Sequence, residues 1–383
     1  MARDKEGFLS ESKVPDSVKL LLWGKSAGRC QYRGCNAQIG IDSLTKSNFN
    51  AAYIAHIVAD KPNGPRGDKV LSPKLNKSLS NVMLMCDTHH RLIDKIDVAG
   101  HPACLLNEMK KEHEERVQLQ TMSGIEGKTH LILYGANVGE HTSGITFHDC
   151  RVALDSHRFP AEASAIEIGL MNSATTDRDP TFWEKEVTNL EANFKSKVLP
   201  RLASGEIKKA SVFARAPQPL LTKLGQLLGE LYHIEVYQSH RNPTTWKWES
   251  DKPFLNYKVI NPSVKKCQVA LVFELSATVT DDRVYHVLGA DTAIWKIAID
   301  NPNNDHIKSR ADLANFRQIV HTTLDKIKSE NTGLEEIHVF QVMAVSEAVE
   351  LGRAWMPKAD LPLVLYDEVR ATGGFVKSIK IQS

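Results

Sequence analysis

Two pairs of thiol and imidazole groups lie close together near the start of the sequence. Four residues separate Cys30 from Cys35, and two residues separate Cys86 from His89. Two short turns that each supply two such ligands are a common way to hold one tetrahedral zinc ion. The sequence therefore predicts a structural Cys₃His zinc site. Such a site contributes on the order of 10 kcal/mol to folding, which suits a segment with few apolar residues.

Three further polar residues surround this pattern and could hydrolyse a phosphodiester. His56 lies in the segment AYIAHIV, Asn81 precedes the apolar run VMLM, and His90 directly follows His89. An imidazole titrates near neutral pH and can take a proton from an attacking water, so we expect His56 to be the general base. A divalent cation on the phosphate would need one or more protein ligands and an otherwise open coordination shell.

The order of these residues resembles that of the HNH endonucleases, and the run CDTHHRLID is similar to the zinc-and-metal turn of that family. The resemblance extends over residues 25–115. It implies a ββα-metal domain in which His90 binds the catalytic Mg²⁺ or Mn²⁺. It also implies that Asn81 either orients the base or lies near the metal.

The sequence departs from the family pattern at one point. Many members carry an acidic residue directly before the first His or three residues before it, where this sequence has Ala55 and Tyr53. The other ligands of the catalytic metal are therefore open, with Asp60 and Asp87 as candidates.

The segment between His56 and Asn81 is rich in positive charge. Two acidic residues, Asp60 and Asp68, stand against five basic ones: Lys61, Arg66, Lys69, Lys74 and Lys77. Such a segment could contact the phosphates of double-stranded DNA without reading bases. The alternative is an ordinary solvated loop.

Composition limits the rest of the chain. A length of 383 residues predicts two or three domains. With 42% hydrophobic and 25% charged residues the chain is neither disordered nor fibrous. The sequence has no apolar stretch of membrane-spanning length and no apolar signal core, so we expect a cytoplasmic protein with reduced cysteines and no membrane partner. The net charge of +2 means that nucleic-acid binding would need a local patch.

The sequence divides into a small N-terminal module and a longer α/β region. We predict helices near residues 16–27 and 105–120 and place the domains at 1–120 and 129–383. The segment 121–128 is poor in apolar residues and contains two glycines, so it is the predicted linker. Beyond it, apolar strands alternate with amphipathic helices.

The longer domain contains an internal repeat. Predicted strands and helices begin near residues 130, 180, 211, 217 and 234, and again near 311, 337, 346 and 363. When Val212-Phe213 is aligned with Val339-Phe340, Leu224-Gly225 falls on Leu351-Gly352. We therefore predict two fused Rossmann-like halves.

This domain has no Walker loop, GxGxxG fingerprint or GxSxG elbow, which favours sensing over a second reaction. Arg215 and Pro217 lie at a strand-to-helix junction, where amides favour anions. Arg241 beside Trp246 could hold phosphate and base. The candidate ligand-binding residues are Arg215, Pro217, Gln238, Arg241, Trp246, Met343, Ser346, Arg353 and Trp355.

The longer domain resembles the SAVED domain, a fusion of two CARF-like units, and the whole chain resembles the HNH–SAVED effector nucleases of bacterial CBASS antiphage systems. The resemblance implies an α+β multidomain protein that degrades double-stranded DNA. It implies activation by a cyclic dinucleotide, such as a cyclic GMP-AMP isomer made by a partner cyclase, which binds SAVED and drives homo-oligomerisation. Two alternatives stay open: a standalone HNH restriction-type endonuclease whose C-terminal domain recognises DNA, and a zinc-stabilised DNA-binding regulator without catalysis.

Overall fold

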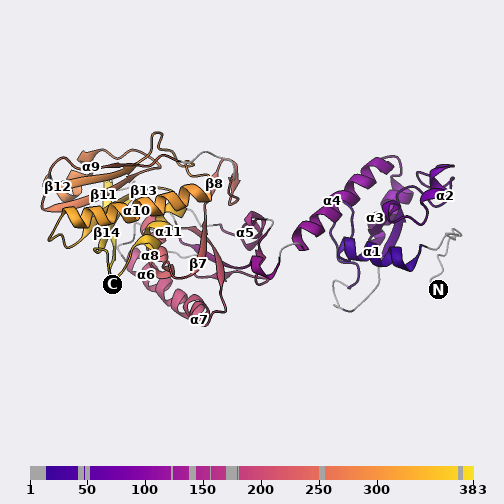
Figure 1. Cartoon of the computed structure of the whole chain (residues 1–383), viewed down its shortest axis with the longest axis horizontal. Helices are drawn as coiled ribbons and strands as arrows, with labels where there is room; N and C mark the ends of the chain where they lie inside the picture. Colours follow the sequence, from indigo (N-terminus) through magenta and orange to yellow (C-terminus); the bar gives the residue numbers. More distant parts are fainter. Residues whose placement is uncertain are drawn as a thin grey trace. The chain divides into compact units, whose positions relative to one another are not determined.

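A computed structural model describes residues 14–41, 47, 52–121, 124–137, 144–155, 157–169, 179, 181–249, 255–369 and 374–383. They form two compact units, Met1–Gly124 and Ile125–Ser383 (Figure 1). The boundary falls within the predicted linker at 121–128, of which residues 122 and 123 lie outside the described part. The first 13 residues, to which the expectation of no signal peptide refers, also lie outside it. Among the described residues, no helix has the length and apolar character needed to cross a membrane.

The N-terminal unit has a ββα arrangement at its centre. Strands β1 (Tyr53–His56) and β2 (Val82–Met85) pair antiparallel. Helix α3 (Asp87–Arg91) follows β2 directly and continues into a π-helical turn, Leu92–Ile96. The connection between the strands contains α2 (Leu71–Leu75) and a 3₁₀ turn, Leu79–Asn81.

Two longer helices, α1 (Asp16–Ser26) and α4 (Ala103–Thr121), support the ββα arrangement. Leu22 of α1, the fully buried β2 and Leu106 of α4 belong to one apolar cluster. Cys30 is part of the same cluster, so the core of this small unit includes one of the predicted zinc ligands.

The first half of the C-terminal unit is a parallel sheet in the order β4-β3-β6-β7, with β5 also paired to β3. Its buried strands β3 and β6 read as continuous apolar runs, as expected of strands covered on both faces. A short hairpin, β8–β9, follows. The elements in chain order are β3 (Lys128–Gly135), α5 (Phe147–Ala153), β4 (Phe159–Pro160), β5 (Ile166–Glu167), α6 (Phe182–Asn193), a π-helical turn (Phe194–Val198), α7 (Leu199–Ala203), β6 (Lys209–Arg215), α8 (Gln218–Leu228), β7 (His233–Tyr237), β8 (His240–Arg241) and β9 (Thr244–Thr245).

The second half is a six-stranded sheet in the order β10-β12-β11-β13-β14-β15, parallel except at its two edges. Two sheets in one unit confirm the predicted division into two α/β halves. The prediction missed β11, α9 and β12, although β11 has the apolar run of a buried parallel strand. The elements are β10 (Lys258–Ile260), β11 (Gln268–Glu274), α9 (Asp281–Leu288), β12 (Thr292–Ala298), α10 (Arg310–Glu330), β13 (Ile337–Val342), α11 (Val345–Ala354), β14 (Leu363–Val369) and β15 (Gly374–Ile381).

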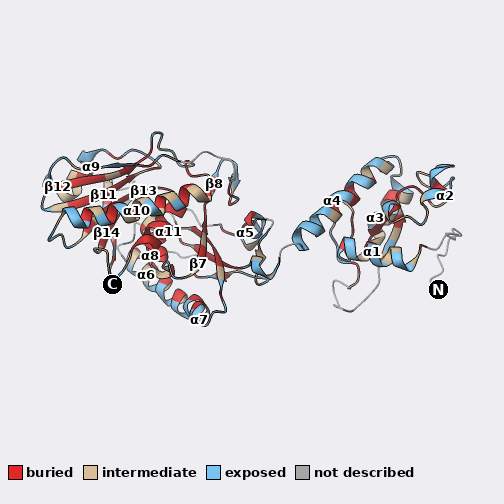
Figure 2. Cartoon of the chain, in the orientation of Figure 1, coloured by how far each residue is buried: buried red, intermediate tan, exposed pale blue. Residues whose placement is uncertain are grey.

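The two halves join through helices α8 and α11, which pack backbone against backbone. A Cβ atom added to Gly225 would lie 1.9 Å from the carbonyl oxygen of Val349, and one added to Gly352 would lie 1.9 Å from that of Thr222. These are the two glycines that the sequence repeat aligns, so the repeat appears in space as a symmetric helix pair. Figure 2 shows both helices as mostly buried.

We predict that Gly225→Ala or Gly352→Ala destabilises the C-terminal unit by about 1–3 kcal/mol, because the methyl group forces the two helices apart. Chemical denaturation followed by circular dichroism measures the change. The matched helical control is Gly24→Ala, where an added Cβ meets nothing within 4 Å. Unchanged stability in both the Gly225→Ala and Gly352→Ala variants would contradict the close contact.

Candidate functional site

The four predicted zinc ligands converge in the N-terminal unit. The ligand atoms of Cys30, Cys35, Cys86 and His89 all lie within 4.8 Å of one another. The Cys86 Sγ atom is 3.1 Å from His89 Nδ1, and the Cys30 Sγ atom is 3.8 Å from it. Bonds of about 2.0–2.3 Å to a tetrahedral zinc ion place ligand atoms roughly 3.5–3.8 Å apart, so the donor set and its spacing fit zinc.

Neighbouring groups hold this cluster in shape. Backbone hydrogen bonds from Cys30 to Ala37 and from Cys35 to Tyr32 close the first turn. The Tyr32 ring stacks on His89 with centroids 4.1 Å apart. Burial raises the pKa of the Cys30 thiol to about 12. A buried thiol of this kind ionises when a cation coordinates it, which is the behaviour of a zinc ligand.

His56 ends strand β1 and is half-buried. Its Nε2 atom lies 3.0 Å from the backbone carbonyl oxygen of Asn76. A carbonyl can only accept, so Nε2 carries the hydrogen and the neutral ring keeps its lone pair on Nδ1. This tautomer is the one that a general base needs.

Asn81 is 1% exposed and acts on the segment that follows β1. Its Oδ1 accepts from the Val58 N–H at 2.8 Å, and its Nδ2 donates to the Val58 carbonyl at 2.8 Å. The Asn81 carbonyl accepts from Ile57 N–H. The Asn81 side chain thus fixes the backbone next to His56. This favours the role of Asn81 in orienting the base over a role near the metal.

His90 faces a carboxylate that the sequence analysis did not single out. The His90 Nε2 atom lies 3.3 Å from Asp94 Oδ2, and the ring stacks on Tyr53 with centroids 4.7 Å apart. Burial alone would raise the pKa of Asp94, but hydrogen bonds from His90 and Arg66 outweigh it and lower the pKa. Asp94 is therefore an ionised carboxylate beside an imidazole, a pair suited to a divalent cation. The spacing of four residues on one helix was the available signal.

Arg66 connects the two sides of this site. Its guanidinium donates to the carbonyls of Ile57 and His56 and to Asp94 Oδ1, the last at 2.5 Å. The side chain is only 7% exposed. The expectation that Arg66 contacts DNA phosphate from a solvated loop is therefore wrong for this residue, because interior acceptors use its donors. The four lysines of the same segment are exposed.

The sequence candidates for the missing metal ligand lie elsewhere. Asp87 pairs with Arg91 at 3.1 Å on the surface of α3. Asp60 is half-buried after β1. Tyr53 occupies the position at which many HNH enzymes have an acid, and it supports the ring of His90 instead.

A second group of possible metal ligands lies at β3. His130, Glu162 and Glu206 have ligand atoms within 4.8 Å of one another. Arg201 pairs with both carboxylates. A guanidinium therefore already supplies the positive charge there, and this group is an ion-pair cluster.

The C-terminal unit brings part of the predicted ligand site together at the ends of β6 and β8. The Arg215 guanidinium lies over the Trp246 ring, 5.4 Å from its centroid, and donates to the Ser239 hydroxyl at 2.8 Å. Burial, and next the nearby charge of Arg241, lower the pKa of Arg215. Pro217 precedes the first residue of α8. Two guanidinium groups of like charge near a helix N-terminus favour an anion.

Gln238, Met343 and Ser346 are buried where the halves meet. Gln238 Oε1 accepts from the Ser346 hydroxyl at 2.7 Å. Met343 exchanges two backbone hydrogen bonds with the side chain of Gln218. The carboxyl ends of β7 and β13 therefore lie side by side, and these residues tie them together.

Arg353 and Trp355 lie at the opposite end of α11 from Ser346. Arg353 is 3% exposed and donates to the carbonyl of Ile234 and to Glu350. The Trp355 indole donates to the Leu361 carbonyl. Both side chains have partners in the interior. This favours a packing role for Arg353 and Trp355 over the contact with a ligand that their positions in the repeat predicted. Ten helical residues span about 15 Å, too far for one ligand group to reach both ends.

Comparison with known proteins identifies the family. The chain matches the SAVED family, "SMODS-associated and fused to various effectors sensor domain", over residues 190–381, and belongs to it. No curated protein matches the sequence.

A search of solved structures finds similar chains. The Acinetobacter baumannii Cap4 SAVED/CARF-domain containing receptor with the cyclic trinucleotide 2'3'3'-cAAA is 13% identical, with a TM-score of 0.43 over 73% of this chain and 56% of that one. The same receptor with 3'3'3'-cAAA is 11% identical, with a TM-score of 0.43 and coverages of 73% and 60%. The Moraxella osloensis Cap4 receptor is 11% identical, with a TM-score of 0.40 and coverages of 73% and 58%. This chain thus spans little more than half the length of these receptors.

We predict that Cys35→Ser lowers the zinc content from one ion per chain towards none and destabilises the N-terminal unit by roughly 3 kcal/mol or more, because the ion links two turns. Elemental analysis and thermal unfolding measure the two effects. Cys104→Ser is the control, since this exposed cysteine of α4 lies outside the cluster. Equal zinc content in both variants would rule the site out.

Proposed function

We propose that this chain is a CBASS-type effector, a metal-dependent endonuclease for double-stranded DNA that a cyclic oligonucleotide activates through the SAVED domain. The observation that carries the proposal is the arrangement of His56 and His90 around one arginine. Arg66 binds the backbone at His56 and the Asp94 carboxylate beside His90. A base and a metal-binding pair are thereby held together next to a Cys₃His cluster.

Each of these residues has a separate role in the proposed hydrolysis. His56 Nδ1 takes a proton from the attacking water, while the Asn76 carbonyl holds the other ring nitrogen. His90 and Asp94 would hold a divalent cation, Mg²⁺ or Mn²⁺, which supplies positive charge at the phosphate and at the leaving 3′-oxygen. Asn81 positions the strand end that carries the base. The exposed lysines between β1 and β2 contact the DNA backbone.

The activating ligand belongs to the SAVED domain. Arg215 and Arg241 supply positive charge, and Trp246 supplies a flat ring beside Arg215. These groups suit the phosphates and bases of a cyclic oligonucleotide. Solved Cap4 receptors carry cyclic trinucleotides. For this chain we propose a cyclic dinucleotide of the GMP-AMP type, made by a partner cyclase.

Activation by assembly is consistent with binding thermodynamics. A ligand shifts an equilibrium only through its different affinities for the two states. A cyclic dinucleotide that contacts residues of more than one protomer binds the oligomer more tightly than the monomer, so it drives homo-oligomerisation. The free protein is then nearly inert on DNA.

Two other functions fit parts of the chain. A restriction-type HNH enzyme would cleave without a nucleotide and would depend on DNA sequence or methylation. A zinc-stabilised regulator would bind DNA without cleaving it. Membership of a sensor family favours the ligand-activated enzyme over both.

We predict that purified protein in Mg²⁺ degrades plasmid DNA only when one member of a panel of cyclic di- and trinucleotides is present. His56→Ala should lower this rate by about 100-fold or more, because it removes the general base. Gel electrophoresis of the plasmid measures the rate. His286→Ala is the matched control, since that histidine is exposed on α9.

The ligand arm of the same assay uses Arg215→Gln. This variant should need roughly tenfold more ligand for half-maximal cleavage, because one charge-assisted contact is lost. Cleavage that ignores every ligand would favour the restriction-type enzyme. DNA binding without cleavage under any ligand would favour the regulator.

We predict that Asp94→Asn lowers Mn²⁺ affinity about 10- to 100-fold, because a neutral amide replaces an ionised ligand. Electron paramagnetic resonance of free Mn²⁺ measures binding without any cleavage. Asp87→Asn is the control, and its affinity should match the wild type. His90→Ala should lose affinity as Asp94→Asn does, and zinc content checks that each variant is folded. Wild-type affinity in Asp94→Asn would remove Asp94 from the metal site.

A further inference from the structure

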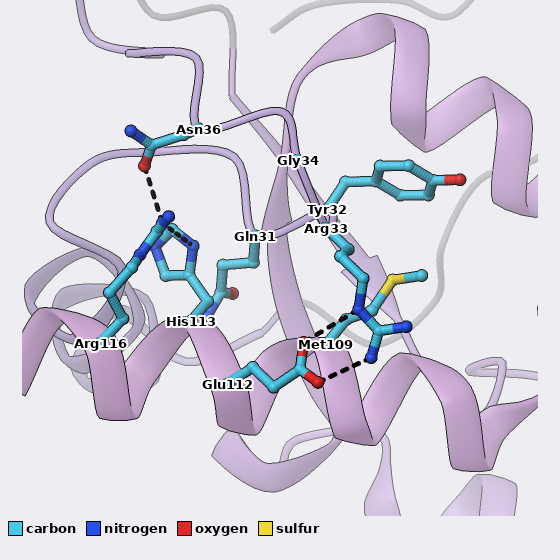
Figure 3. A pocket seen from close by; sticks show the side chains of 9 residues that line it. All are labelled: Gln31, Tyr32, Arg33, Gly34, Asn36, Met109, Glu112, His113 and Arg116. Atoms are coloured by element: carbon cyan, nitrogen blue, oxygen red, sulfur yellow. Dashed lines mark hydrogen bonds and ion pairs between the residues drawn. The ribbon is translucent and has the colours of Figure 1, made fainter. Parts of the chain in front are cut away.

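A pocket lies between helix α4 and the turn at residues 30–37, which carries Cys30 and Cys35 and is called the zinc turn below. It contains none of the proposed catalytic residues. Its volume is about 180 Å³, enough for an ion of phosphate size. The turn contributes Gln31, Arg33 and Asn36, and α4 contributes Glu112, His113 and Arg116. Figure 3 shows these side chains around the pocket, with Arg116, His113 and Asn36 on one side and Arg33 with Glu112 on the other.

The two arginines that line this pocket differ in their partners. Arg33 forms a two-pronged ion pair with Glu112, with nitrogen–oxygen distances of 3.0 and 2.8 Å, and also pairs with Glu108 at 3.2 Å. Arg116 contacts only neutral acceptors, Asn36 Oδ1 at 2.8 Å and His113 Nδ1 at 3.0 Å. Within the described part of the chain no carboxylate pairs with Arg116. The guanidinium of Arg116 is thus available to an anion, because no carboxylate among the described residues is paired with it.

Around Arg116, the acceptor atoms of Asn36 and His113 are already occupied by hydrogen-bond donors. His113 Nε2 lies 3.0 Å from the Ser26 carbonyl oxygen, so this nitrogen donates and Nδ1 accepts from Arg116. Burial lowers the pKa of His113, which keeps the ring neutral. Arg29 also donates to Asn36, at the backbone oxygen 3.1 Å away. The acceptors of Asn36 and His113 are therefore already used.

Gln31 adds a buried donor at the base of the pocket. The side chain is 1% exposed, and its Oε1 accepts from the Leu84 N–H at 2.8 Å. Its Nε2 has no hydrogen-bond partner among the described residues. A buried N–H group without an acceptor is unfavourable. Because other atoms cover the Gln31 Nε2 atom, an oxyanion in the pocket would satisfy it after a small movement of this amide.

From these contacts we infer that the pocket between the zinc turn and α4 binds an oxyanion of the phosphate class, held by Arg116 and by the amide of Gln31. Two sources share this chemistry: a backbone phosphate of bound DNA and a free phosphate group. The DNA source rests on the proposed nuclease function, whereas the free-anion source does not.

The test uses the full-length protein and two variants of the pocket. Arg116→Gln removes the charge but retains an amide that can reach the same acceptors. Gln31→Glu retains the oxygen that accepts from Leu84 and replaces the donor by a second oxygen. Lys111→Gln is the control, since Lys111 lies on the same helix, does not line the pocket, and is 75% exposed at its side chain.

The first arm measures binding of a fluorescent 20-base-pair duplex by anisotropy in the His56→Ala background at several salt concentrations. Arg116→Gln should weaken binding roughly three- to tenfold and lower the slope of log K against log salt by about 0.9. The second arm measures the rise in unfolding temperature that inorganic phosphate causes, relative to chloride of equal ionic strength. Both pocket variants should lose that rise, and Lys111→Gln should keep it.

The two arms give distinct answers. Loss of DNA affinity and of the salt slope assigns the pocket to a backbone phosphate. Loss of the phosphate effect alone assigns it to a free anion. If both variants behave as Lys111→Gln in both arms, the inference is overturned, whether or not the wild-type enzyme cleaves plasmid. If phosphate binds through Arg116 but the wild type never cleaves, the nuclease proposal fails and the pocket stands.

Discussion

The absence of two Cβ atoms determines how the sensor is built. At Gly225 and Gly352 an added methyl carbon would lie 1.9 Å from a carbonyl oxygen of the facing helix. Helices α8 and α11 can therefore pack at backbone distance, closer than ordinary side chains allow. Each helix follows the central strand of its own sheet, so this contact also sets the carboxyl ends of the two sheets beside one another. Hydrogen bonds from Gln218 to Met343 and from Ser346 to Gln238 then fix that junction.

A single arginine has the corresponding role in the N-terminal unit. The strands β1 and β2 pack into the apolar cluster, but the short helix α3 has no buried residue of its own. Arg66 joins the two by donating to the carbonyls of His56 and Ile57 at the end of β1, to the Ile93 carbonyl and to Asp94. A buried guanidinium with all these acceptors is well compensated, whereas removal of one acceptor would leave charge unpaired in the interior. The geometry of His56 relative to His90 therefore depends on this side chain.

The sequence predicts the features that depend on local spacing. The pairs Cys30-x₄-Cys35 and Cys86-x₂-His89 predict ligands that converge, and the structure brings them within 4.8 Å. The aligned glycines predict the two halves. The four-residue spacing from His90 was the one local signal for Asp94, and other helical acids share such spacing; the contact with Arg66, 28 residues earlier, forms only in the fold. The sequence repeat placed Arg353 and Trp355 among the ligand-binding candidates. Both side chains are buried, however, and their burial depends on which elements pack over α11, which the repeat alone does not predict.

Two arginines of like charge lie near each other at the proposed ligand site. Arg215 and Arg241 lie close enough that the charge of one lowers the pKa of the other. Partial burial of Arg215 reduces the screening of this repulsion by water. In the proposed function, an anion between the two arginines would reduce this repulsion and would accept charge-assisted hydrogen bonds from them. Such a site would favour ligands with phosphates over neutral nucleosides. A ligand of this kind shifts an equilibrium only if its affinity differs between the two states.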